Sequence, residues 1–208
     1  MSATADLASL RAMGAPFVTT GEAAVRLGMT ESGASHLLRR LADEGLVLPV
    51  RRGLWSLDAT PDPLRLAGWV TAPYPSYVSL WSALHAHRML SQVPRETYLV
   101  SLGRAGRIDT RFGTIVVHQI APEVFGGYTT EHGIALATPA KAIFDIAYLS
   151  ATHGTRFRRL PELDLRHGYR PREARAWATK IASPRIRTIT LERLGRIERE
   201  AEAAAFAG

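Results

Sequence analysis

The chain has 208 residues, 46% of them apolar, and ordinary Gly and Pro contents, which indicate a globular rather than a disordered protein. It has no cysteine, which excludes disulfides and thiolate metal sites and fits a reducing cytoplasm. Its formal net charge of +7 favours an acidic partner such as nucleic acid.

The sequence predicts a cytoplasmic protein with no membrane partner. No apolar run reaches the roughly 18 residues that a membrane-spanning helix needs. The first residues also lack the basic and apolar regions of a secretory signal. The charge is unevenly distributed, since residues 1–60 hold six Arg and six Asp or Glu, whereas residues 151–200 hold thirteen Arg or Lys against six Asp or Glu. The excess positive charge therefore lies near the C-terminus.

Three helices are predicted within the first 45 residues. The first is "DLASLRAM", whose apolar residues follow helical spacing. After the extended piece "FVTT", the second helix is "TGEAAVRLG", with Thr19 or Thr20 as its cap and Gly28 as its end. The third helix runs from about Glu31 to Glu44 and follows a tight turn, with Thr30 as its cap.

The third helix is amphipathic. Its apolar residues recur at i, i+3, i+4 and i+7 and form one buried stripe of Ala34, Leu37, Leu38 and Leu41. At 100° per residue, the polar residues lie on or beside the opposite face. These candidate base-reading residues are Ser32, Ser35, His36, Arg39 and Arg40.

A β-hairpin is predicted directly after this helix. The segments "LVLPV" and "LWSLD" alternate as strands, and Arg51, Arg52 and Gly53 form the tip. Two short helices, a longer helix and a hairpin indicate a winged helix-turn-helix over residues 1–60. The third helix would enter the major groove, and the two tip arginines would contact phosphate or the minor groove. The alternatives are a module that binds protein, or a small domain with ordinary surface arginines.

A second, mixed α+β domain is predicted over residues 76–208, after a Pro-rich linker over residues 61–75 that holds a short helix near Leu64 to Trp69. A helix is predicted over Ser76 to Leu90, followed by strands "ETYLVSLG" and "FGTIVVHQI" with the charged turn "RAGRIDTR" between them. "YTTEHGIALAT" holds shorter extended pieces. We therefore expect a small sheet of roughly three or four strands.

Three further helices complete the second domain. "TPAKAIFDIAYL" begins with Thr138 as cap and Pro139 at the first helical position. The tail adds "PREARAWATKIA" and "TLERLGRIEREAEAAAFA".

The sequence shows no catalytic constellation, so we expect no enzyme, no cofactor and no metal. His85 and His87 lie on a predicted helix at i and i+2, where side chains point apart. "SLGRAGR" lacks the P-loop pattern and no nucleophile elbow is present. An enzyme that modifies a toxin or nucleic acid is the alternative, because catalytic groups need not be close in sequence.

The most basic segment of the chain is "RFRRLPELDLRHGYRPREAR". It is either a solvated surface or a binding patch for nucleic acid or an acidic protein. The candidate patch residues are Arg156, Arg158, Arg159, Arg166, Arg170 and Arg172.

A winged helix near residues 15–57, followed by two motifs in the second domain, resembles the AbiE-type antitoxins of bacterial type IV toxin–antitoxin systems. The first is a Ser-x-x-Ser-Ala-Leu helix, here Ser79, Ser82, Ala83 and Leu84. The second is an Ala-Thr-Pro-x-Lys-Ala helix ending in Asp, here Ala137, Thr138, Pro139, Lys141, Ala142, Ile143, Phe144 and Asp145. The similarity covers most of residues 15–150.

The resemblance implies two functions. The winged helix would bind inverted repeats in its own promoter and repress the operon. The second domain would neutralise a co-encoded toxin of the nucleotidyltransferase type, without a stable complex being required. The main alternative is a ligand-responsive winged-helix transcriptional regulator whose second domain senses a small molecule.

Overall fold

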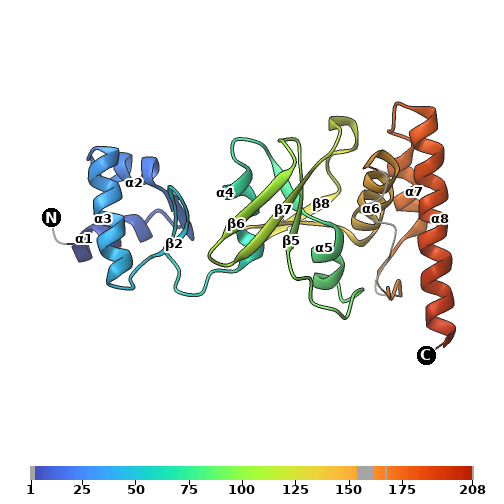
Figure 1. The fold of residues 1–208 in the computed structure, drawn as a ribbon, viewed down its shortest axis with the longest axis horizontal. Coiled ribbons are helices and arrows are strands. Elements are labelled where there is room, and N and C mark those ends of the chain that lie inside the picture. Colours follow the sequence, from blue (N-terminus) through green and yellow to red (C-terminus); the bar gives the residue numbers. More distant parts are fainter. Residues whose placement is uncertain (1–2, 154–161, 167, 208) are drawn as a thin grey trace.

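The computed structural model describes residues 3–153, 162–166 and 168–207. Within them the chain forms eight α-helices and two β-sheets of three and six strands, so the predicted α+β class is confirmed. The elements follow one another along the long axis of the molecule (Figure 1). The first helices and the small sheet lie at one end, the large sheet lies in the middle, and the last three helices lie at the other end.

Residues 3–58, called the N-terminal unit below, combine three helices with the small sheet. The elements are α1 (Ala3–Arg11), β1 (Phe17–Thr19), α2 (Thr20–Leu27), α3 (Glu31–Asp43), β2 (Leu48–Arg51) and β3 (Leu54–Ser56). The three strands are antiparallel in the order β1-β3-β2. Each predicted helix and strand of this unit is therefore present, with shifts of a few residues at the ends.

Local capping fixes the helix boundaries of the N-terminal unit. Thr19 and Glu22 form a capping box on α2, in which the Glu22 N–H donates to Thr19 Oγ1 at 3.1 Å and the Thr19 N–H donates to Glu22 Oε2 at 2.8 Å. Gly28 ends α2 with a φ of 64°, which a residue with a Cβ adopts at a cost. The Gly33 N–H donates to Thr30 Oγ1 at 3.2 Å and caps α3.

The predicted apolar stripe of α3 is buried in the core of the N-terminal unit. Its members pack with residues of α1, α2 and β3, among them Leu10, Ala23 and Trp55. Because this packing orients the helix, the opposite face of α3 is left toward solvent.

A six-stranded sheet forms the middle of the molecule. Its strands are β4 (Ser76–Val78), β5 (Thr97–Ser101), β6 (Gly106–Thr110), β7 (Gly113–Gln119), β8 (Tyr128–Glu131) and β9 (Ile134–Ala137). Their order is β6-β7-β5-β4-β9-β8, with parallel pairing of β5 with β7 and of β4 with β9. The prediction of three or four strands was wrong, because two short segments with weak sequence signals also join the sheet.

The first of these segments is residues 76–78, which were predicted as the start of a helix. They pair with β5 and β9 instead, and the helix α5 (Leu80–Ala86) starts only after them. Tyr77 and Val78 are both fully buried because the strand is covered on both faces. A short apolar run of this kind fits a buried strand as well as a helix.

The second segment is "RAGRIDTR", which was predicted as a turn. Residues 106–110 form β6, which pairs antiparallel with β7 at the edge of the sheet. Arg107 and Asp109 are exposed on it, and charged residues are common on edge strands because they oppose further strand pairing.

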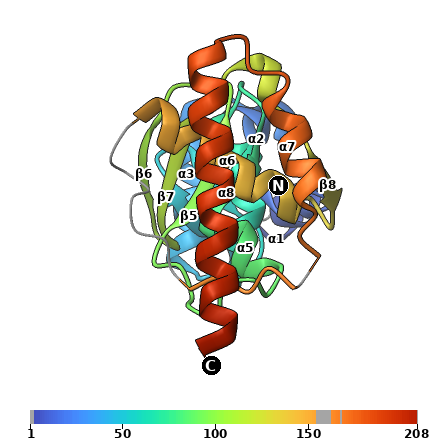
Figure 2. The ribbon, with the colours of Figure 1, turned by 90° about the vertical axis from the view of Figure 1, so that its right-hand side faces the viewer.

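The last three helices are α6 (Pro139–His153), α7 (Pro171–Ala178) and α8 (Pro184–Ala207). The Lys141 N–H donates to Thr138 Oγ1 at 3.2 Å, which confirms Thr138 as the cap of α6. Helix α8 begins at Pro184 instead of Thr190, and α7 is shorter than predicted. Figure 2 shows α8 crossing the end of the molecule in front of α6. No helix among the described residues is long and apolar enough to cross a membrane.

The predicted linker over residues 61–75 is partly helical and packed. It forms a 3₁₀ helix (Pro63–Leu66) and α4 (Ala67–Thr71), where Leu66 and Val70 are buried. These residues share one apolar cluster with Phe17, Val50 and Leu54 of the N-terminal unit and with residues of β4, β5 and β7. The N-terminal unit is therefore joined to the remainder of the chain, called the second unit below, by packing as well as by the backbone.

Candidate functional site

The predicted base-reading residues lie on the outer side of α3. Ser32, His36, Arg39 and Arg40 are exposed, and Ser35 is half-buried. The local sequence produces this arrangement, because the apolar stripe fixes which side of the helix faces the core.

The β2–β3 hairpin places Arg51 and Arg52 at its tip, where both are exposed. Gly53 has a φ of 78°, which suits glycine in a tight turn. The Thr20 N–H donates to the Gly53 carbonyl at 2.9 Å, and the Trp55 Nε1–H donates to Thr20 Oγ1 at 3.1 Å. These two bonds hold the hairpin against the start of α2, so the tip has a fixed position relative to the helices.

A groove of about 470 Å³ lies between α3 and the hairpin. It brings together five of the seven residues predicted to bind DNA, namely Ser32, Ser35, Arg39, Arg51 and Arg52. His36 and Arg40 lie on α3 outside this lining. The groove is lined by Thr20, Glu31, Ser32, Ser35, Arg39, Pro49, Arg51, Arg52, Gly53 and Trp55.

The second unit reaches the same hairpin. The Arg51 Nη2–H donates to the Val70 carbonyl at 3.4 Å, so this guanidinium also contacts α4. The Arg111 backbone N–H, at the turn between β6 and β7, donates to the Val50 carbonyl at 3.1 Å. Arg111 is exposed, and its backbone lies against the strand that leads to Arg51 and Arg52. The sequence did not indicate it, because only the fold brings this turn to the hairpin.

The predicted C-terminal basic patch is described only in part. Arg156, Arg158 and Arg159 lie outside the described residues. Arg166 is exposed and forms an ion pair with Asp164 at 2.8 Å. Arg170 and Arg172 are also exposed. Arg170 lies just before α7, and Arg172 lies in its first turn.

A buried polar cluster, comprising Tyr77, Ser79, Lys141 and Asp145, lies inside the second unit. All four residues are fully buried. Asp145 accepts hydrogen bonds from Ser79 Oγ at 2.7 Å and from the Tyr77 hydroxyl at 3.1 Å, and it forms an ion pair with Lys141. Burial raises the pKa of Asp145 and lowers the pKa of Lys141, since each charged form loses its water.

Three aromatic rings surround the Lys141 ammonium group. Nζ lies 4.9 Å from the ring centres of Phe144 and Trp177 and 5.4 Å from that of Tyr77. Gly127 packs against the same cluster, where an added Cβ would lie 2.6 Å from Trp177. The cluster is closed to solvent, and its hydrogen bonds and ion pair connect β4 and the start of α5 to α6.

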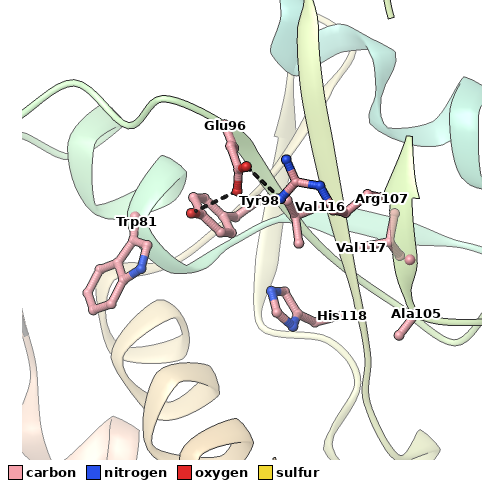
Figure 3. Close-up of a pocket in the computed structure, with 9 residues that line it drawn as sticks. Trp81, Glu96, Tyr98, Ala105, Arg107, Val116, Val117 and His118 are labelled. Atoms are coloured by element: carbon pink, nitrogen blue, oxygen red, sulfur yellow. Dashed lines mark hydrogen bonds and ion pairs between the residues drawn. The ribbon is translucent and has the colours of Figure 1, made fainter. Parts of the chain in front are cut away.

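A pocket of about 380 Å³ opens in the second unit beside the edge strand β6 (Figure 3). Sequence reasoning missed it, because four separate elements line it. Its lining comprises Trp81 of α5, Glu96 and Tyr98 at the start of β5, Ala105, Gly106 and Arg107 at β6, and Val116, Val117 and His118 of β7.

The two predicted helical histidines bind separate backbone carbonyls. His85 Nδ1 lies 3.0 Å from the Leu90 oxygen, and His87 Nε2 lies 2.8 Å from the Ala137 oxygen. In the described part of the chain, no group of three or more His, Asp or Glu side chains is arranged to hold a metal ion.

Comparison with known proteins gives no family for this chain. No protein-family model matches the sequence, and no curated protein matches it either.

Proposed function

We propose that the N-terminal unit is a winged helix-turn-helix that binds DNA, with α3 as the recognition helix and the β2–β3 hairpin as the wing. The observation that supports this proposal best is the groove between them, where Arg39 of α3 faces the same space as Arg51 and Arg52 of the hairpin. Arg39 would contact base edges in the major groove, and the hairpin arginines would contact phosphates.

The charge balance of this unit predicts modest affinity for a single copy. Residues 1–60 are formally neutral, so few phosphate charges are compensated by one unit. Two copies on an inverted repeat would supply the missing contacts, in agreement with the promoter repeats that the family resemblance implies.

Replacing Arg51 and Arg52 together by Ala is expected to weaken binding to all DNA sequences. Each lost phosphate contact lowers the slope of log K against log salt by roughly 0.9, so the slope should fall by about one to two. Fluorescence anisotropy titrations of operator and random DNA at several salt concentrations measure both quantities. The matched control replaces Arg104 and Arg185, two exposed arginines far from the hairpin in the sequence, by Ala. An unchanged slope in the hairpin variant would contradict a phosphate contact.

We further propose that the second unit acts as an antitoxin against a nucleotidyltransferase-type toxin. Support comes from the two motif segments on which the resemblance rests, because they meet in the buried polar cluster through the Ser79–Asp145 hydrogen bond. The two motifs thus belong to one folded unit. Ser82 of α5 also accepts a hydrogen bond from the Tyr98 N–H of β5 at 2.9 Å.

Co-expression with the adjacent gene of the native operon tests this role. Full-length protein is expected to restore growth, and the Arg51→Ala, Arg52→Ala variant should restore it equally well, since DNA contact is not needed for neutralisation. The full-length variant is a better test than a truncated second unit, because a cut near residue 60 would expose Leu66 and Val70. Failure of both proteins to restore growth would reject the antitoxin proposal.

The second candidate function is a ligand-responsive regulator. The pocket in the second unit favours it, because β6 and β7 line this pocket and their connecting turn is hydrogen-bonded to the hairpin through Arg111 and Val50. A ligand that shifts the β6–β7 pair would thereby act on the proposed wing.

A further inference from the structure

The pocket beside β6 has the features of a small-molecule site. Its volume lies in the lower part of the range typical of ligand pockets, roughly 300–1,000 Å³. Aromatic and aliphatic side chains form its walls, and a small number of polar groups lie at fixed positions. In Figure 3, Trp81 lies on one side of Tyr98, Arg107 lies on the other, and His118 lies beside them.

An internal network holds the polar groups in place. Glu96 Oε1 forms an ion pair with Arg107 Nη1 at 2.6 Å, and Glu96 Oε2 accepts a hydrogen bond from the Tyr98 hydroxyl at 3.2 Å. Burial and the neighbouring Glu96 raise the pKa of Tyr98, so its hydroxyl stays protonated and donates to that carboxylate. Both carboxylate oxygens of Glu96 are therefore engaged by groups of the protein itself.

Arg107 has hydrogen-bond donors that its contact with Glu96 does not use. A guanidinium group has five N–H donors, and one terminal nitrogen of Arg107 contacts Glu96. The Arg107 side chain is 61% exposed, against 23% for that of Glu96. An incoming group thus meets N–H donors of Arg107 that Glu96 does not use, whereas both oxygens of Glu96 are already engaged.

Three aromatic side chains contribute to the walls of the pocket. The rings of Tyr98 and His118 are nearly parallel, at an interplanar angle of 15° with centres 6.2 Å apart, and Trp81 adds a third ring from α5. Aromatic rings prefer to pack against other rings in offset or edge-on contact. Val116 lies on the same face of β7 as His118 and completes an apolar base.

We propose that this pocket binds a small aromatic carboxylate, with the ring against Trp81 and Tyr98 and the carboxylate on Arg107. The arginine fork suits a planar carboxylate, because two parallel N–H groups can donate to its two oxygens. The proposal gives the ligand class for the second candidate function, but binding itself requires no DNA. A failure of the DNA-binding tests and a failure of this proposal are therefore distinguishable.

Calorimetric titration of the full-length protein tests the proposal with three probes that share one ring system. These are indole-3-acetate, the neutral indole-3-acetamide and the cationic tryptamine, and benzoate and 4-hydroxybenzoate extend the acid series. We expect the acids to bind and the amide and amine to bind at least roughly tenfold more weakly, because a charged hydrogen bond is lost.

Arg107→Gln should weaken binding of the acids roughly tenfold or more, whereas Arg107→Lys should retain part of it. Arg104→Gln, at an exposed position just before β6, is the matched control and should bind as the wild type does. Because Arg107 is on the surface of an edge strand, circular dichroism should show the Gln variant folded. The proposal is overturned if no acid binds at millimolar concentration, if tryptamine binds as tightly as indole-3-acetate, or if Arg107→Gln leaves the affinity unchanged.

Discussion

An Asp145→Ala variant is expected to lose about 3–5 kcal/mol of its free energy of unfolding. The reason is that Lys141 would keep its fully buried position among aromatic rings without a counter-ion, and Ser79 and Tyr77 would lose their acceptor. For a chain of this size, the loss corresponds to a drop in melting temperature of roughly 6–20 °C. Urea unfolding followed by circular dichroism measures it.

The control for this prediction removes both charges at once. A Lys141→Met, Asp145→Leu variant leaves no buried ion, so it should be clearly more stable than Asp145→Ala. Similar stabilities for the two variants would show that the unpaired ammonium group is not the cause. If the free energy of unfolding of Asp145→Ala lies within about 1 kcal/mol of the wild-type value, as is typical when an exposed ion pair is removed, the ion pair does not have the proposed role.

Arg39→Ala is expected to reduce discrimination between operator and random DNA by roughly 5- to 150-fold, which corresponds to about 1–3 kcal/mol. Arg39 is exposed on α3 and lines the groove, where its guanidinium would meet base edges. Anisotropy titrations of both DNAs at one salt concentration give the ratio of affinities. Arg185→Ala, on the exposed surface of α8, is the charge-matched control. If both affinities fall by the same factor, Arg39 contacts only the DNA backbone.

The N-terminal unit could be predicted closely because its signals are local. The Thr19–Glu22 capping box, the Thr30 cap and the left-handed Gly28 are each encoded within a few residues. The apolar stripe of α3 then fixes which residues face outward. Helix α3 and the hairpin are consecutive in the chain, so most of the groove between them could be predicted as well.

The second unit was less predictable because distant pairings determine it. Ser76–Val78 is a strand because it pairs with β5 and β9, whereas the sequence alone led to a helix prediction for the same residues. The Lys141 and Asp145 spacing is visible in the sequence, but their complete burial is not. The pocket unites Trp81 with Arg107 and His118 from separate elements, and no sequence pattern links them.

The groove between α3 and the hairpin is the surface that we propose binds DNA. The most direct test is a nuclease protection experiment on the promoter upstream of the protein's own gene, with the full-length protein and an Arg39→Ala, Arg52→Ala variant. We predict that the wild type protects two half-sites roughly one helical turn, or 10 base pairs, apart or a multiple of it, and that the variant does not at the same concentration. The absence of any protected region, or the same protection by the variant, would contradict the claim.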